Sequence, residues 1–151
     1  MDYTDILIAV RKIARAINLD SKRIQKISGL SIPQLLSLIY ISNCEKYQCS
    51  QLQLRKFLQL NSSTVTGIVG RLEEKGYLVK IPAKGDKRST WLSLTAMGLK
   101  QIENAPELFQ QRLSHKLSTL PKQDIQDIEK GLDLLINLLG EEDLPLENQA
   151  N

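Results

Sequence analysis

Side chains suited to acid–base, nucleophilic or metal chemistry are scarce: the sequence has one histidine, His115, and two cysteines, Cys44 and Cys49. A structural zinc ion draws about four ligands from Cys and His, so we expect no metal site. A hydrolytic triad needs a histidine with an orienting partner, and His115 lies in a run typical of the polar side of a helix. We therefore predict no catalytic residue and no enzyme.

Two interpretations of the cysteines remain open. Cys44 and Cys49 are five positions apart and form a redox pair if their geometry permits a disulfide. The alternative is one buried and one incidental cysteine in a reducing cytoplasm, and it is favoured because no feature that lowers a thiol pKa is evident. The glycines match neither a P-loop nor a dinucleotide-binding motif, so we expect no cofactor.

Composition and charge narrow the class of protein. The chain has 151 residues, enough for one domain, with 42% hydrophobic and 25% charged residues. It has neither an apolar run of membrane-spanning length nor a basic, apolar start typical of secretion, so we expect a soluble cytoplasmic protein without membrane contact. Residues 50–94 carry eight Lys/Arg against three Asp/Glu, whereas residues 95–151 carry five against ten. A basic middle segment favours a polyanionic partner.

The elements that position this charge are mostly helices. Apolar residues at helical spacing predict a long helix over 3–27. Capping boxes at Ser31 and Ser50 predict two further helix starts, and Asn61 is expected to cap a helix that ends at Gly76. Because a tight turn at 59–61 joins the last two helices, the pattern indicates a helix-turn-helix.

The second helix of this motif has one unusual face. Small, uncharged residues gather opposite its apolar side, at Ser62, Ser63, Thr66, Gly67 and Gly70. Each interior glycine costs roughly 1 kcal/mol relative to alanine, so a bare face indicates a close approach of the backbone to another surface. The DNA major groove and a packed helix are the two candidates.

The rest of the chain predicts a wing and two more helices. The β-prone segments 77–81 and 90–94 flank a basic tip, which together indicate a hairpin. Helices follow over 96–140, kinked or restarted at Pro106 and opened again at Pro121. Tyr40, Phe57 and Tyr77 are expected in the core. The fold class is thus mainly α with a small β-hairpin wing, in a single domain with a flexible tail over 141–151.

This arrangement resembles the MarR family of winged helix-turn-helix transcription regulators. The most specific segments are 63–66 and 71–79, the Asp86-Lys87-Arg88 wing signature, and Leu94-Thr95-Ala96-Met97-Gly98. A narrower resemblance, over 7–17, 29–36 and 104–106, is to the subgroup that includes regulators of ectoine (compatible-solute) synthesis genes.

The resemblance implies a homodimer whose helices at 1–28 and 96–140 interleave, with a DNA-binding lobe at 31–95. The two recognition helices would enter successive major grooves of a near-palindromic operator. A repressor released by a small aromatic or other effector, or by a stress signal, is the expected mode of action. Such an effector pocket would involve Arg11, Arg15 and Tyr40.

The family pattern also implies roles for single residues. The five residues of the bare face would meet base edges, and Arg71 would contact phosphate or brace the wing. In the wing, Arg88 would enter the minor groove and Lys84 and Lys87 would contact phosphates. Asp86 would orient Arg88 or Arg71, and the alternative is that it only forms the turn. Because the recognition helix offers no central Arg, Asn or Gln for bidentate base contacts, we expect modest direct readout and a contribution from DNA shape.

Other classes of function compete with this interpretation. A winged helix can serve protein–protein contact without reading DNA, and an RNA-binding winged helix would prefer structured RNA over duplex DNA. A steep fall of affinity with salt separates nucleic-acid binding from protein–protein contact.

Overall fold

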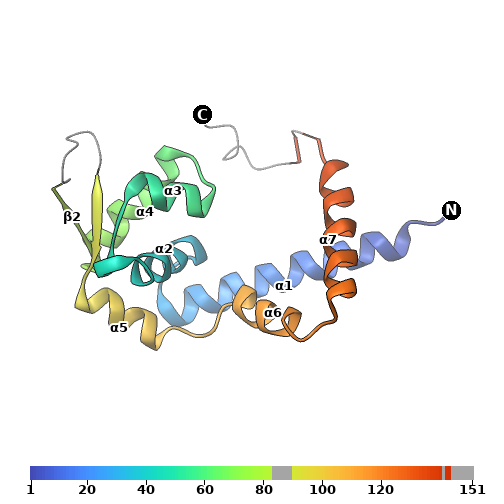
Figure 1. Ribbon diagram of the computed structural model, residues 1–151, viewed down its shortest axis with the longest axis horizontal. Helices are drawn as coiled ribbons and strands as arrows, with labels where there is room; N and C mark the ends of the chain where they lie inside the picture. Colours follow the sequence, from blue (N-terminus) through green and yellow to red (C-terminus); the bar gives the residue numbers. More distant parts are fainter. Residues whose placement is uncertain (83–89, 141, 144–151) are drawn as a thin grey trace. The chain divides into compact units, whose positions relative to one another are not determined.

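The computed structural model describes residues 1–82, 90–140 and 142–143. These residues form two compact units (Figure 1). One unit holds Met1–Asp20 together with the C-terminal helices, and the other holds Ser21–Pro106. The long helix α1 (Thr4–Ser28) contributes to both.

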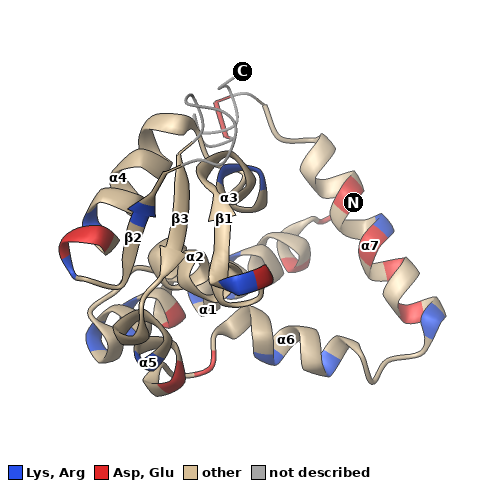
Figure 2. Cartoon of the chain, turned by 60° about the vertical axis from the view of Figure 1, so that its left-hand side comes forward, with Lys and Arg blue, Asp and Glu red and all other residues tan. Residues whose placement is uncertain are grey.

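The unit over Ser21–Pro106 is a winged helix-turn-helix. After the last part of α1 come α2 (Ile32–Ser42), the short 3-10 helix η1 (Glu45–Tyr47), β1 (Gln48–Ser50), α3 (Gln51–Leu58), α4 (Ser62–Glu74), β2 (Leu78–Ile81), β3 (Trp91–Leu94) and α5 (Ala96–Asn104). The strands pair antiparallel in the order β1-β3-β2, and Figure 2 shows β3 between its two partners.

Side-chain caps set where these helices begin. The Ser31 hydroxyl accepts the Gln34 N–H, and Ser50 accepts the Gln53 N–H in the same way. In both capping boxes the glutamine side chain reaches back to the serine N–H, so two otherwise unpaired donors are satisfied at each start. Thr95 caps α5 by accepting the Gly98 N–H.

The core of this unit is aliphatic. Its fully buried side chains come from the first four helices, the connection between α1 and α2, and the strands: Ile24, Leu30, Leu35, Leu38, Ile41, Leu54, Val65, Val69, Leu72, Leu78 and Leu92. Leu92, in the middle strand, pairs with Cys49 on one side and with Lys80 on the other. The helix-turn-helix therefore packs on a continuous apolar centre that holds α4 in place.

The other unit consists of the first part of α1, α6 (Phe109–Leu117) and α7 (Lys122–Asn137). Its main buried polar group is Asp20, which accepts the Phe109 N–H at 2.8 Å and forms an ion pair with Arg112 Nη2 at 3.2 Å. Large apolar side chains on α1 and α7 stay exposed, including Ile6, Ile13, Ile17, Leu132 and Leu134.

The expected wing hairpin, formed by β2 and β3, is confirmed, and β1 adds a short edge strand that the sequence did not predict. One expectation about the core is wrong. Phe57 lies outside the core with 46% of its surface exposed, stacked on Tyr40 at a centroid distance of 4.5 Å. Within the unit over Ser21–Pro106, Lys75 Nζ donates to Gly29 O and Gln101 Nε2 donates to Ser28 O, and these bonds hold the end of α1.

Candidate nucleic-acid interface

The turn between α3 and α4 determines how α4 is presented. Gln59 adopts a left-handed conformation (φ +56°) and ends α3 through a bond from its N–H to Arg55 O. Asn61 then starts α4, its Oδ1 accepting the Thr64 N–H at 2.8 Å. A left-handed residue followed by an N-cap makes the abrupt change of direction that a helix-turn-helix needs.

Helix α4 buries one face and exposes the face predicted to meet DNA. Val65, Ile68, Val69 and Leu72 are buried, whereas Ser62, Ser63, Thr66, Gly67 and Arg71 are exposed and Gly70 is half-buried. The first turns of the helix carry no charge, and the charged residues lie at its C-terminal end (Figure 2). The predicted division of α4 into an apolar and a bare face is therefore confirmed.

The two glycines of α4 have open space beside them. A Cβ atom added at Gly67 or at Gly70 would meet no atom of the described chain within 4 Å outside the helix's own backbone. Helix–helix packing within this chain, the structural alternative for these glycines, is thus ruled out for the described residues. The bare face is available to an external partner.

The hydroxyls on this face have defined partners. Ser63 Oγ donates to Asn61 Oδ1 at 2.9 Å, and Thr66 Oγ1 donates to Ser62 O at 2.8 Å. Thr66 Oγ1 also accepts a hydrogen bond from Gln51 Nε2 on α3, at 3.1 Å. Sequence analysis missed Gln51, because its partner lies 15 positions away and only the packing of α3 on α4 brings the two together.

Two basic side chains of the interface lie in the described part of the chain, on α4 and β2. Arg71 is exposed at the end of α4, and Lys80 on β2 lies 3.8 Å from Glu73 in an exposed ion pair. An exposed pair of this kind contributes little to stability, so Lys80 stays available to an anion. The predicted wing residues Lys84, Asp86, Lys87 and Arg88 lie outside the residues that the structure describes.

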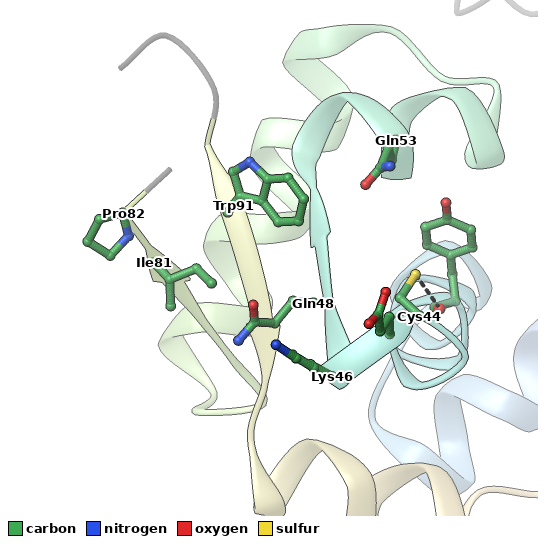
Figure 3. Close-up of a pocket in the computed structure, with 9 residues that line it drawn as sticks. Cys44, Lys46, Gln48, Gln53, Ile81, Pro82 and Trp91 are labelled. Carbon is green, nitrogen blue, oxygen red and sulfur yellow. Dashed lines mark hydrogen bonds between the residues drawn. The ribbon is translucent and has the colours of Figure 1, made fainter. Parts of the chain in front are cut away.

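A pocket of about 410 Å³ lies on the other side of α3, between the end of α2 and the sheet (Figure 3). It is lined by Tyr40, Cys44, Glu45, Lys46, Gln48, Gln53, Ile81, Pro82 and Trp91. The pocket contains Tyr40, one of the three residues predicted for an effector site. Arg11 and Arg15, exposed on α1, are not among its lining residues.

Both cysteines are free thiols near this pocket. Cys44 Sγ donates to Tyr40 O at 3.3 Å, and Cys49 is buried in the short strand β1. Burial, with Cys44 beside it, raises the pKa of Cys49 from its ordinary value of 9.0 to about 12. Burial also raises the pKa of Tyr40. Since the thiolate is the reactive form, the protonated Cys49 is a poor partner for thiol oxidation.

The protein is a winged helix-turn-helix protein. This class is defined by the capped helix-turn-helix, the three-stranded wing sheet and the bare, exposed face on the second helix.

The MarR family model matches residues 28–89. The chain is 38% identical over 61 residues to the HTH-type transcriptional regulator PecS of Dickeya dadantii, a match that covers 40% of this chain and 37% of PecS. It is 30% identical over 112 residues to the HTH-type transcriptional regulator BilQ of Clostridium symbiosum, covering 74% of each.

The fold agrees with solved structures. The MarR family regulator Sco3205 of Streptomyces coelicolor, solved in complex with DNA, superposes with a TM-score of 0.70 at 17% identity, over 94% of this chain and 92% of that one. The chain belongs to the MarR family, whose members are transcriptional regulators and not enzymes. None of the helices in the described ranges is both long and apolar enough to span a membrane.

Proposed function

We propose that the protein is a homodimeric regulator that binds double-stranded DNA sequence-specifically and represses transcription. The observation that supports the proposal most directly is the bare face of α4. This face is exposed, its first turns carry no charged residue, and there is open space beside Gly67 and Gly70. The major groove of B-DNA is about 12 Å wide and admits a helix, most closely where side chains are small. Sco3205, a structure of the same fold, is solved with DNA bound.

Charge supports the same assignment. Arg71 and Lys80 flank the bare face and would contact phosphates, which hold the register of a recognition helix without specifying sequence. For the wing we propose the roles that the family pattern implies: Arg88 in the minor groove, Lys84 and Lys87 on phosphates, and Asp86 orienting an arginine. Such contacts release counterions, so affinity falls steeply with salt.

A second copy of the chain is the proposed partner of the unit that holds α6 and α7. Exposed apolar side chains on α7 include Ile128, Leu132 and Leu134, at 41%, 45% and 61% exposure. Side chains of this size rarely stay uncovered in such number on a monomer. A dimer places two α4 helices on DNA, about one helical turn (~34 Å) apart, so the operator is near-palindromic.

In this proposal, repression results from occupation of the promoter, because a dimer bound in two successive major grooves blocks access of RNA polymerase. For release by a small molecule we propose the pocket beside Tyr40. An indole, a phenol, carboxamides and charges of both signs line it, which suits a planar molecule with polar edges. Its walls include Gln53 of α3 and Trp91 of β3, so a bound molecule can shift the elements that hold α4 and the wing.

The experiment is selection of duplexes from a random-sequence library by the purified full chain, followed by sedimentation of the protein with and without the enriched duplex. The proposal predicts a near-palindromic motif bound by two protomers. The variant Leu132→Glu should sediment as a monomer and lose the motif, whereas Glu129→Gln on the same helix should retain both. Recovery of no motif, with only salt-insensitive weak binding, would refute DNA reading and favour the protein-interaction alternative.

A further inference from the structure

The contacts of Thr66 limit what this side chain can offer to DNA. Its hydroxyl proton goes to Ser62 O at 2.8 Å, and one lone pair of Oγ1 accepts from Gln51 Nε2 at 3.1 Å. Because the hydroxyl proton is already committed to a carbonyl, Gln51 must turn its amide nitrogen toward Thr66, and the orientation of that amide is fixed. One lone pair and the methyl group of Thr66 remain.

The residues around Thr66 on α4 leave its methyl group accessible to a partner. Thr66 is exposed, and the positions one and four residues further along α4 are Gly67 and Gly70, which have no side chain. Two hydrogen bonds to Oγ1 hold χ1 of this β-branched residue in one rotamer, so the methyl group has one direction. Its neighbour Ser63 also donates its hydroxyl proton within the chain, to Asn61 Oδ1.

We infer that Thr66 reads a thymine in each half-site through its methyl group, and that Gln51 is the positioning residue that enforces this choice by occupying a lone pair of Thr66 Oγ1. Among the bases only thymine presents a methyl group in the major groove, so an apolar contact there distinguishes T from C. Cytosine presents an amino donor instead, and Gln51 leaves only one of the two lone pairs of Thr66 Oγ1 to accept it. This inference rests on the proposed function of DNA binding.

The sharpest probe is deoxyuridine, because it removes the thymine methyl group and leaves every hydrogen-bonding group of the base unchanged. Each thymine of the selected duplex is replaced in turn, and affinity is measured by fluorescence anisotropy. For the wild-type chain we expect one position per half-site at which deoxyuridine weakens binding about fourfold, the value of one buried methyl group. Substitution in both half-sites should weaken binding about fifteenfold.

Two variants separate the roles of the two residues. Thr66→Ser keeps the hydroxyl with both hydrogen bonds and removes only the methyl group, so it should bind the thymine and deoxyuridine duplexes equally at that position. Gln51→Ala frees the lone pair, so it should retain the preference for thymine over deoxyuridine and accept cytosine about as well as thymine. Lys56→Ala, at an exposed position of the same helix, is the matched control and should change neither ratio.

The outcomes are distinct. Specific, salt-dependent binding that is indifferent to deoxyuridine at every position overturns this inference and leaves the proposed function intact. A deoxyuridine effect that persists in Thr66→Ser assigns the thymine contact to another residue and overturns it as well. Failure of the wild-type chain to prefer any sequence is instead a failure of the proposed function. Melting curves of each variant confirm that the ratios are compared between folded proteins.

Discussion

Replacing the two glycines of α4 with alanine should make the protein more stable and weaken its binding to DNA. Gly67 and Gly70 lie in the interior of α4, where glycine costs about 1 kcal/mol relative to alanine. A Cβ at either position meets nothing within 4 Å, and both backbones have ordinary helical φ, so no strain offsets this gain. The double variant should gain about 2 kcal/mol, which for 151 residues raises Tm by about 4–8 °C.

The effect on DNA affinity should have the opposite sign. If the bare face lies against the groove, each added methyl group overfills a close contact. Overfilling a tightly packed contact typically costs about 1–3 kcal/mol, which corresponds to a loss of roughly 5- to 150-fold in affinity. Because a dimer carries the substitution in both half-sites, the loss should fall in the upper part of this range or beyond it.

The assay pairs thermal unfolding with an anisotropy titration on the selected duplex. Gly131→Ala in α7 is the control for stability, since Gly131 also lies inside a helix with no atom within 4 Å of an added Cβ. It should raise Tm by a similar amount per substitution. A Gly67→Ala and Gly70→Ala protein that melts higher and binds DNA as tightly as wild type would show that this face does not approach DNA, and the reasoning would be wrong.

Four further predictions concern single residues. Asp20→Ala should destabilise the protein by about 1–3 kcal/mol in urea unfolding, because it leaves the Phe109 N–H without its acceptor and the part-exposed Arg112 without its partner, and an equal stability would refute this. Folding raises the pKa of Cys49 from 9.0 to about 12. The contribution of this thiol to the free energy of unfolding should therefore be fully present below pH 9.0 and be lost as the pH rises toward about 12, where the folded thiol ionises. Iodoacetamide at neutral pH should therefore modify Cys44 before Cys49, as mass spectrometry of digests can test, and the reverse order would contradict the burial. Asn61→Ala should lose about 1 kcal/mol of stability in the same unfolding assay through the lost cap of α4, whereas an unchanged midpoint would mean that the cap contributes nothing.

Local signals explain which elements the sequence could predict. Ser31, Ser50 and Asn61 each cap a helix start as expected, because an N-cap and its partner lie within three residues of each other. The bare face of α4 was predictable for the same reason, since helical periodicity alone places its residues on one side. The family resemblance, carried by 63–66 and 71–79, followed from these short segments.

Features that depend on tertiary packing were missed. Strand β1 has only three residues, and it is a strand only because Cys49 pairs with Leu92, 43 positions later. The bond from Gln51 to Thr66 joins two helices, so no pattern within either helix indicates it. Phe57 has an apolar side chain at helical spacing, yet it stacks on Tyr40 at the surface rather than in the core.

The central claim, that the chain reads duplex DNA, is tested most directly by one anisotropy titration. The full chain is titrated against the selected duplex and against a scrambled duplex of equal composition, at about 50 mM and about 200 mM salt. A dimer that neutralises about 6–10 phosphates should lose roughly 10³–10⁵ in affinity over this range while keeping its preference for the selected duplex. Equal binding to both duplexes, with little dependence on salt, would contradict the claim.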